Sequence, residues 1–468
     1  MTLHLADRRS TSTPMRRSKR PLIETDVETG ARRRRRQPPN GRDGNRTGDP
    51  SPRGTRRPEP LATARVPAVH RDTTAALGGA YPFVAGAAET GGMFIGHDTI
   101  TGQRFCFDPW RLYEKQIVSN TNIVIIGNIG WGKTNTAMAI ALRGIATGHC
   151  VLVPGDPKND WTRLAESLGG QAIRLGPTSP GRLNPLDLGT SPKNVDLGAW
   201  RHAAEQRRAA LIVAIVEAIA PALAPLPPEI RETLTASLDG LARDNATPTL
   251  PQLVARLADE PAATPARAAL AVLCSGPLAG MLDRPATATP DPSAPIIAVG
   301  TADVADNDLA HTLAVLTATS QLASATGTRR RYVIYDEAWR ILASPTHLDR
   351  VNSELRLSRA KGTATVLITH ALSDTDKSAD AGSSAAATAR GLVALCDTRI
   401  IFRQAPGETA RTATELTLTS PERDAFTTLG KGEALWKTGA RTRRIHTDLG
   451  ASEQILFNTD LRWAVGER

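Results

Sequence analysis

The chain has 468 residues, which is long enough for one large domain with additions or for two domains. Its formal net charge of +10 is unevenly distributed, because residues 1–71 hold 18 Lys/Arg and 7 Asp/Glu whereas the remaining residues hold 39 and 40. The positive excess therefore belongs to the N-terminal segment, and the rest of the chain lacks the overall basic character of a nucleic-acid-binding protein.

The cysteine pattern and the apolar pattern exclude several classes of protein. No apolar leader and no apolar run of about 18 residues is found, so the sequence predicts neither a signal peptide nor a membrane-spanning helix. The scattered cysteines form no CxxC pair, which disfavours a metal or disulfide framework and is typical of reduced thiols in a cytoplasm. They are Cys106, Cys150, Cys274 and Cys396.

Residues 1–78 are rich in Arg, Pro, Gly, Ser and Thr and lack apolar periodicity, so we expect a disordered tail. Its densest block of charge is Arg32–Arg36. Such a tail is either a solvated, self-repelling segment or a contact with DNA or an anionic membrane face, and its composition does not separate these alternatives.

After the tail, strand and helix patterns alternate, which predicts a mostly parallel sheet with helices on both faces. Two parts of this core, 79–197 and 289–468, flank residues 198–288, whose Ala-, Leu- and Pro-rich helical spacing predicts an all-α insertion. The predicted strands are 91–98, 104–108, 122–126, 149–153, 171–175, 294–300, 331–335, 363–369 and 398–404. The predicted helices are 136–143, 161–168, 308–325 and 345–361, and a hairpin is expected at 432–444.

A phosphate-binding loop is predicted after the strand at 122–126. The next residues fit the pattern GxxxxGK(S/T), and a good helix former follows them. In this arrangement the loop and helix N-terminus cradle phosphates, the lysine reaches the β- and γ-phosphates, and the threonine hydroxyl binds Mg²⁺. We expect nucleotide contacts from Gly127, Asn128, Ile129, Gly130, Trp131, Gly132, Lys133, Thr134 and Asn135, with Thr134 also a metal ligand.

Trp131 is unusual in such a loop, where small residues predominate. Its indole either stacks on the base or ribose of a nucleotide or packs against a neighbouring element of the protein.

A second candidate site is the strand at 331–335, which ends in Asp336 and Glu337. Ligands bind at the carboxyl ends of strands in open α/β sheets. We expect Asp336 to hold Mg²⁺ with its hydration shell, and Glu337 to orient and polarise the attacking water. Alone, the Asp-Glu pair would equally fit a helix N-terminus, and its combination with the loop favours the catalytic interpretation.

The helix at 345–361 carries basic residues, among them Arg356 and Arg359. They form either a solvated face or the source of an arginine finger that reaches a neighbouring subunit's γ-phosphate, a role worth on the order of 10³–10⁵ in rate. His370 ends the next strand and is either a γ-phosphate sensor or an ordinary hydrogen-bonding residue. Gln404, at the end of the last core strand, is expected to face the nucleotide.

Several stretches together resemble the VirB-four (TraC-like) ATPases of conjugation and type IV secretion, over roughly residues 90–460. His370 stands where a Gln is usual in that family, and the basic tail takes the place of the family's large N-terminal domain. The similar stretches are GDPKND at 155–160, RLNPLD at 182–187, DEAW at 336–339, SRAKGTATVLITH at 358–370 and KGEALWKTG at 431–439.

The resemblance implies a RecA-like P-loop core of the FtsK/HerA-type motor superfamily, with ATP and Mg²⁺ as cofactors and a hexamer with sites between subunits. It implies a cytoplasmic motor for conjugative DNA transfer or type IV secretion, held peripherally at the inner face of the membrane by channel proteins, with DNA as a further partner. Two other functions stay open: a DNA-translocating coupling protein of the TraG/FtsK type, and a nucleotide-binding assembly scaffold with little turnover. The near-neutral charge beyond the tail disfavours the first, and Glu337 disfavours the second.

Overall fold

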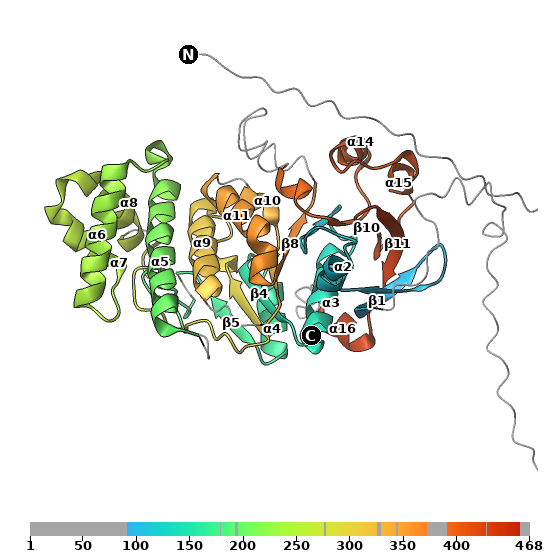
Figure 1. The fold of residues 1–468 in the computed structure, drawn as a ribbon, viewed down its shortest axis with the longest axis horizontal. Helices are drawn as coiled ribbons and strands as arrows, with labels where there is room; N and C mark the ends of the chain where they lie inside the picture. The colour runs from blue at the N-terminus through green and yellow to red at the C-terminus, as the bar shows by residue number, and fades with distance from the viewer. Residues whose placement is uncertain are drawn as a thin grey trace, which may run out of the picture. The chain divides into compact units, whose positions relative to one another are not determined.

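The computed structural model describes residues 91–177, 179–191, 195–275, 278–324, 329–342, 345–371, 391–426 and 428–458. The predicted disordered tail lies outside these residues. In the described part of the chain, one 11-stranded sheet has the order β2-β1-β11-β10-β9-β3-β8-β7-β4-β6-β5 (Figure 1). The strands are β1 (Met93–Asp98), β2 (Arg104–Phe107), β3 (Ile123–Ile126), β4 (Cys150–Asp156), β5 (Gln171–Arg174), β6 (Ile296–Gly300), β7 (Arg331–Tyr335), β8 (Thr363–Thr369), β9 (Thr398–Ile401), β10 (Glu433–Thr438) and β11 (Arg441–Thr447).

The sheet has a parallel part and an antiparallel part. All pairings from β9 through β3, β8, β7, β4 and β6 to β5 are parallel, whereas β2, β1, β11, β10 and β9 pair antiparallel. The mostly parallel sheet predicted from the alternation of strands and helices is therefore confirmed. The parallel part positions the ends of several core strands at one edge of the sheet.

Both faces of the central strand β3 are buried, as its uninterrupted apolar sequence predicts. Successive side chains of a strand point to opposite faces. Accordingly, Ile123 and Ile125 pack in the core that α3 and α4 share, whereas Val124 and Ile126 pack in the core that includes α11. Helices therefore cover both faces, as expected. These helices are α2 (Pro109–Glu114), α3 (Lys133–Ala146), α4 (Asp160–Ser167), α9 (Asp308–Ser324), α10 (Ala338–Leu342) and α11 (Pro345–Lys361).

The segment predicted as an all-α insertion contains only helices among its described regular elements. Its apolar side chains form one core with Ile173 of β5 and Val299 of β6, and α5 lies beside α9 (Figure 1). The helical segment is thus packed onto the end of the sheet at β5 and β6. Its elements are α5 (Leu197–Ile219), η2 (Pro221–Leu223), α6 (Pro228–Asp244), α7 (Leu250–Arg256), η3 (Leu257–Asp259), η4 (Pro261–Ala263) and α8 (Thr264–Cys274), and η6 (Ala302–Val304) follows β6.

The predicted C-terminal hairpin is present as β10 and β11. Trp436 of β10 is buried, and its ring meets Phe105 and Phe107 of β2 edge-on, with centroids 5.0 and 5.2 Å apart. The first two strands of the fold consequently lie beyond the hairpin, separated from β3 by β11, β10 and β9. The remaining helices, α14 (Pro406–Glu415), α15 (Ser420–Ala425) and α16 (Ala451–Leu456), flank this part of the chain.

Candidate nucleotide site

The predicted phosphate-binding loop connects β3 to α3 and approaches the end of β9 closely. A Cβ atom on Gly127 would lie 2.4 Å from the Cβ of Phe402, so only glycine fits at this position. The Asn128 N–H donates to the Arg403 carbonyl at 3.0 Å. Gly132 precedes α3 with a left-handed φ of 104°. Because the first N–H groups of a helix have no intrahelical partner, the loop ends in donors suited to a phosphate.

Lys133 begins α3, and its side chain is buried within the loop. Its Nζ donates to the carbonyl oxygens of Gly127 at 2.5 Å and Asn128 at 2.9 Å. Thr134 and Asn135 follow it and line the same cavity. The loop therefore brings a fixed positive charge and a hydroxyl group to one place.

Trp131 packs against neighbouring protein elements, the second of the two interpretations given above. The guanidinium carbon of Arg403 lies 4.8 Å from the centre of its ring, in the geometry of a cation–π contact. Its carbonyl accepts from the Gly432 N–H at 3.1 Å. Trp131 is not among the residues that line the cavity. Its ring contacts Arg403 at the end of β9, and its backbone carbonyl contacts the turn before β10.

Asp336 follows β7 directly and is buried. Its Oδ2 accepts from the Trp161 Nε1–H at 3.0 Å, and its Oδ1 accepts from the Glu337 N–H at 3.1 Å. Trp161 lies in α4 and is fully buried, so it holds the carboxylate in one orientation.

Glu337 is held by side chains from three different segments. Lys158, which follows β4, pairs with its Oε1. His370 Nε2 lies 2.9 Å from its Oε2, and the Trp339 Nε1–H donates to the same oxygen at 2.8 Å. The backbone of Glu337 has a φ of 57°, which is uncommon for a residue with a side chain. Contacts from several elements therefore maintain a strained conformation at this position.

The carboxylates of the site titrate differently because their surroundings differ. Burial raises the pKa of Asp336, and the neighbouring Glu337 adds to that effect. Burial also acts to raise the pKa of Glu337, but hydrogen bonds and positive charge from His370 and Lys158 outweigh it and hold that pKa well below its usual value. The site thus contains one carboxyl group that resists ionisation and one that favours it.

Asp156, at the end of β4, organises the start of α4. Its carboxylate accepts from the backbone N–H groups of Lys158 at 3.3 Å, Asp160 at 3.2 Å and Thr162 at 2.8 Å. Burial nevertheless raises its pKa to about 6, and the nearby Asp160 and Asp336 contribute to the shift. The protonation of Asp156 therefore depends on the charges of Asp160 and Asp336.

These groups meet around a cavity of about 360 Å³. It lies where β3, β4, β7 and β8 end, at the edge where ligands bind in parallel sheets. The predicted site residues that line it are Ile129, Gly130, Gly132, Lys133, Thr134, Asn135, Asp336, Glu337 and His370.

Gln404 does not line the cavity. Its side chain is buried, and neither its Nε2 nor its Oε1 has a hydrogen-bond partner among the described residues. A role for Gln404 toward the nucleotide stays a prediction.

Arg356 and Arg359 lie away from the cavity of their own chain. Both are exposed in α11, which ends before β8 begins, whereas the cavity is at the other end of β8. A strand of seven residues spans roughly 20 Å. The guanidinium carbon of Arg359 lies 5.8 Å from the centre of the Tyr113 ring, and Arg356 Nε donates to Asn352 Oδ1 at 3.1 Å.

Five residues that line the cavity were missing from the predicted site: Lys158, Asp160, Ile368, Thr369 and Lys431. The first two belong to the GDPKND stretch, whose resemblance to a family motif was a usable signal. Trp161 and Trp339 were also missed. Trp339 belongs to the DEAW stretch and lies two positions from Glu337, whereas Trp161 reaches Asp336 across 175 positions of the chain through packing that no local pattern indicates.

No family model and no curated protein matches the chain. Its structure is similar to that of VirB4 of Thermoanaerobacter pseudethanolicus, with 18% identity, coverage of 79% of this chain and 100% of that chain, and a TM-score of 0.63. It is also similar to the bacterial conjugative coupling protein TrwBdeltaN70 in its form with sulphate, with 14% identity, coverage of 70% and 85%, and a TM-score of 0.50. These similarities confirm the expected RecA-like P-loop fold and, at the level of fold, the resemblance to VirB-four ATPases.

Among the described helices, none combines the length and the apolar character needed to cross a membrane.

Proposed function

We propose that the chain is a Mg²⁺-dependent ATPase that acts as a motor in conjugative DNA transfer or type IV secretion. The observation that carries this proposal is the convergence of the loop residues Lys133 and Thr134 with the acidic pair Asp336 and Glu337 on one cavity. Phosphoryl-transfer enzymes depend on positioning and on charge stabilisation more than on covalent chemistry, and these residue types supply both.

The residues of the cavity fit a nucleoside triphosphate with its metal ion. Thr134 and Asp336 offer the hydroxyl and carboxylate oxygens that Mg²⁺ prefers, and the loop ahead of α3 offers N–H donors and the Lys133 ammonium for phosphates. When bound, the ion supplies charge neutralisation on the phosphates. Asp336 would hold it, and Trp161 would keep that carboxylate in position.

Glu337 is the residue that we assign to the attacking water. Its carboxylate stays ionised because Lys158 and His370 stabilise the negative charge. An ionised carboxylate can accept a hydrogen bond from water and orient it toward the terminal phosphate. His370 contacts Glu337 and also lines the cavity, so it is suited to report the state of the phosphate to the end of β8.

The motor role rests on a ring of subunits. Arg356 and Arg359 lie too far from their own cavity to act there, which favours a role at the site of a neighbouring subunit. We expect a hexamer. The fold similarity to VirB4 and to a coupling protein supports a conjugation or secretion context, with channel proteins as partners and a peripheral location at the membrane.

The decisive experiment measures ATP turnover with and without Mg²⁺, and with single- and double-stranded DNA at fixed salt. We expect Mg²⁺-dependent turnover that Lys133→Ala abolishes and Glu337→Gln lowers by about 10²–10⁴-fold. Turnover that both variants retain would contradict the proposal.

The same measurement separates this motor from its rivals. Strong stimulation by DNA that survives deletion of residues 1–75 would indicate a translocase that grips DNA, because the deletion removes every contact that the tail makes. Salt is held fixed because contacts between a basic tail and DNA weaken as the salt concentration rises. Nucleotide binding without turnover would indicate an assembly scaffold.

A further inference from the structure

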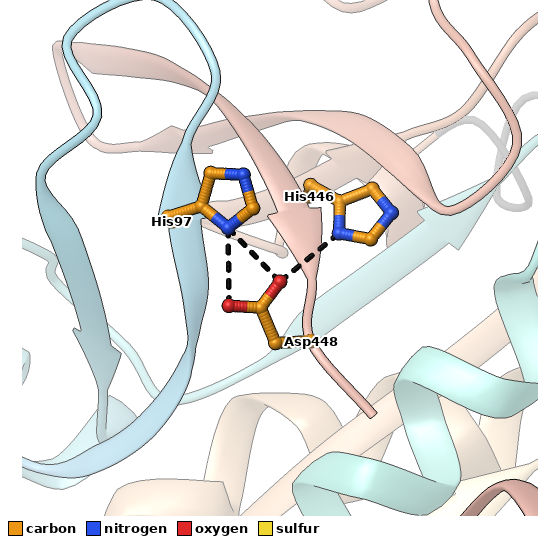
Figure 2. A group of neighbouring side chains, drawn as sticks. All are labelled: His97, His446 and Asp448. Atoms are coloured by element: carbon orange, nitrogen blue, oxygen red, sulfur yellow. Dashed lines mark hydrogen bonds and ion pairs between the residues drawn. The ribbon is translucent and has the colours of Figure 1, made fainter. Parts of the chain in front are cut away.

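A second group of potential ligands lies outside the nucleotide site. His97 of β1 and His446 of β11 are direct partners in the antiparallel pairing of these strands, and Asp448 follows β11 (Figure 2). His97 Nδ1 lies 2.9 Å from Asp448 Oδ1 and 3.0 Å from Oδ2, and His446 Nδ1 lies 3.1 Å from Oδ1. Two imidazoles thus direct the same type of nitrogen at one carboxylate.

We propose that His97, His446 and Asp448 bind one divalent transition-metal ion, with Zn²⁺ as the best fit. One nitrogen from each imidazole and one carboxylate oxygen lie within 4.8 Å of one another. Two histidines and a carboxylate form a common three-ligand zinc set, in which water completes the coordination. Mg²⁺ and Ca²⁺ prefer all-oxygen sites and fit this group poorly.

The distances suit coordination after a small adjustment. Metal–ligand bonds of about 2.0–2.1 Å in a tetrahedral site place ligand atoms about 3.3 Å apart. The two nitrogen–oxygen distances are shorter by only a few tenths of an ångström, and the side chains of His97, His446 and Asp448 are 44%, 40% and 37% exposed. The two imidazole nitrogens lie within 4.8 Å of each other. The exposed carboxylate can therefore move away from the rings, the rings can turn toward an ion, and all three side chains can be reached from solvent.

A side chain of α3, the helix that follows the predicted phosphate-binding loop, holds the backbone of this group in place. Arg143 of α3 donates to the backbone carbonyls of Phe94 (2.8 Å), Ile95 (2.9 Å) and Asp448 (2.5 Å), and its guanidinium pairs with Glu453 (2.6 Å). The backbone that carries His97 and Asp448 is thereby fixed before any ion binds, which lowers the entropic cost of assembling ligands.

Two other arginines near the proposed site, Arg444 and Arg104, each contact another side chain. Arg444, two residues before His446, is paired with Glu433, the cross-strand partner of His446, at 2.6 Å. Arg104, the cross-strand partner of His97, has its guanidinium carbon 4.9 Å from the centre of the Phe94 ring.

The proposed site has a connection to the turn before β10. A Cβ atom on Gly432 would lie 3.2 Å from His446 Nε2, and the Gly432 N–H donates to the Trp131 carbonyl of the phosphate-binding loop. An ion here would crosslink β1 to the end of the hairpin and stabilise that turn. The proposal does not depend on ATP hydrolysis.

The test is a titration of the untagged, chelator-treated full chain with Co²⁺, without nucleotide, followed by visible absorption. We expect one equivalent of Co²⁺ to bind with a ligand-field band that Zn²⁺ displaces and excess Mg²⁺ does not. His97→Ala, His446→Ala and Asp448→Asn should each weaken binding by more than about 100-fold. His202→Ala, at an exposed histidine of α5, should bind like the wild type. Asp336→Asn should keep the band, and loss of the band in that variant would place the ion in the nucleotide site instead.

A second measurement separates ion binding from a purely hydrogen-bonded cluster. In the absence of metal, both Nδ1 atoms must carry protons in order to donate to Asp448, whereas ligation removes those protons. Histidine NMR should therefore show both rings changing tautomer on addition of Zn²⁺. Zn²⁺ should also raise the melting temperature of the wild type and leave that of the three ligand variants unchanged. Unchanged tautomers, or Co²⁺ binding that survives loss of both histidines, would overturn the proposal.

Discussion

Lys158 and Glu337 form an ion pair between the ends of β4 and β7, inside the cavity that holds the phosphate-binding loop. The two residues are 179 positions apart in the chain. Their pairing joins the GDPKND stretch to the acidic pair after β7, so a positive charge stands beside the carboxylate that we assign to water activation.

Replacing Lys158 by Met should move the acid limb of the pH–rate profile to higher pH. In the proposed mechanism Glu337 works in its ionised form, and the Lys158 ammonium helps to hold its pKa below the usual value. Without that charge the pKa rises, so protonation and loss of turnover begin at a higher pH as the solution is acidified. Turnover measured between pH 3 and 9 tests this, with Lys361→Met, whose lysine lies outside the nucleotide cavity, as the control. An unmoved acid limb in Lys158→Met would rule out the coupling.

Trp161→Phe should raise the Mg²⁺ concentration needed for half-maximal turnover by roughly tenfold or more. The substitution removes the indole N–H that donates to Asp336 Oδ2 and leaves this buried carboxylate held, among the described residues, only by the Glu337 N–H. Trp339→Phe is the matched control, because its indole donates to Glu337 and should lower turnover with little change in Mg²⁺ dependence. Equal Mg²⁺ dependence in both variants would show that Asp336 does not hold the ion.

Gly127→Ala and Gly130→Ala should differ sharply although both lie in one loop. The new Cβ atom of Gly127→Ala would collide with Phe402. The new Cβ atom of Gly130→Ala would meet no atom within 4 Å, so its only cost is the left-handed φ of 81°, which destabilises by about 1–2 kcal/mol. Denaturant unfolding should therefore show a larger loss in the free energy of unfolding for Gly127→Ala than for Gly130→Ala. Nucleotide binding, measured by fluorescence, should also be weaker in Gly127→Ala. Equal losses would mean that the approach to Phe402 is not a constraint.

The free energy of unfolding should depend on pH through Asp156. Burial raises its pKa from 3.8 to about 6, so the folded state holds this proton more tightly than the unfolded state. Stability from the neutral form is present below the unfolded pKa and is lost as pH rises through about 6, an effect of about 3 kcal/mol. Asp156→Asn should lack this change. Parallel curves for the two proteins between pH 4 and 7, measured by denaturant unfolding, would contradict the assignment.

Arg356→Ala and Lys133→Ala chains should complement each other if the arginine acts between subunits. Each variant alone should be inactive, whereas a mixture forms some interfaces that combine an intact Lys133 with an intact Arg356 of the neighbour. The same holds for Arg359. Turnover of mixed and separate proteins at equal total concentration is the measurement. Full activity of Arg356→Ala and Arg359→Ala alone would instead assign both side chains to a solvated basic face.

Sequence reasoning was most informative where the determining interactions are local. The strand, loop and helix around Lys133 follow from β-branched residues, glycines and helix formers that lie next to one another in the chain, and the structure has all three elements. The parallel core and the hairpin at β10 and β11 were predicted for the same reason, since side-chain periodicity reports which faces of a segment are buried.

Local patterns in the sequence predicted a loop of the form GxxxxGK(S/T), an acidic pair at a strand end, an alternating α/β core and a helical segment. Four relationships became visible only in the folded chain: β1 and β2 join the sheet beyond the hairpin, Trp131 packs on Arg403, Lys158 meets Glu337, and His97 lies beside His446. These relationships depend on which strands pair and on how helices pack, and such pairings are set by the summed burial of many distant residues, which no local pattern encodes.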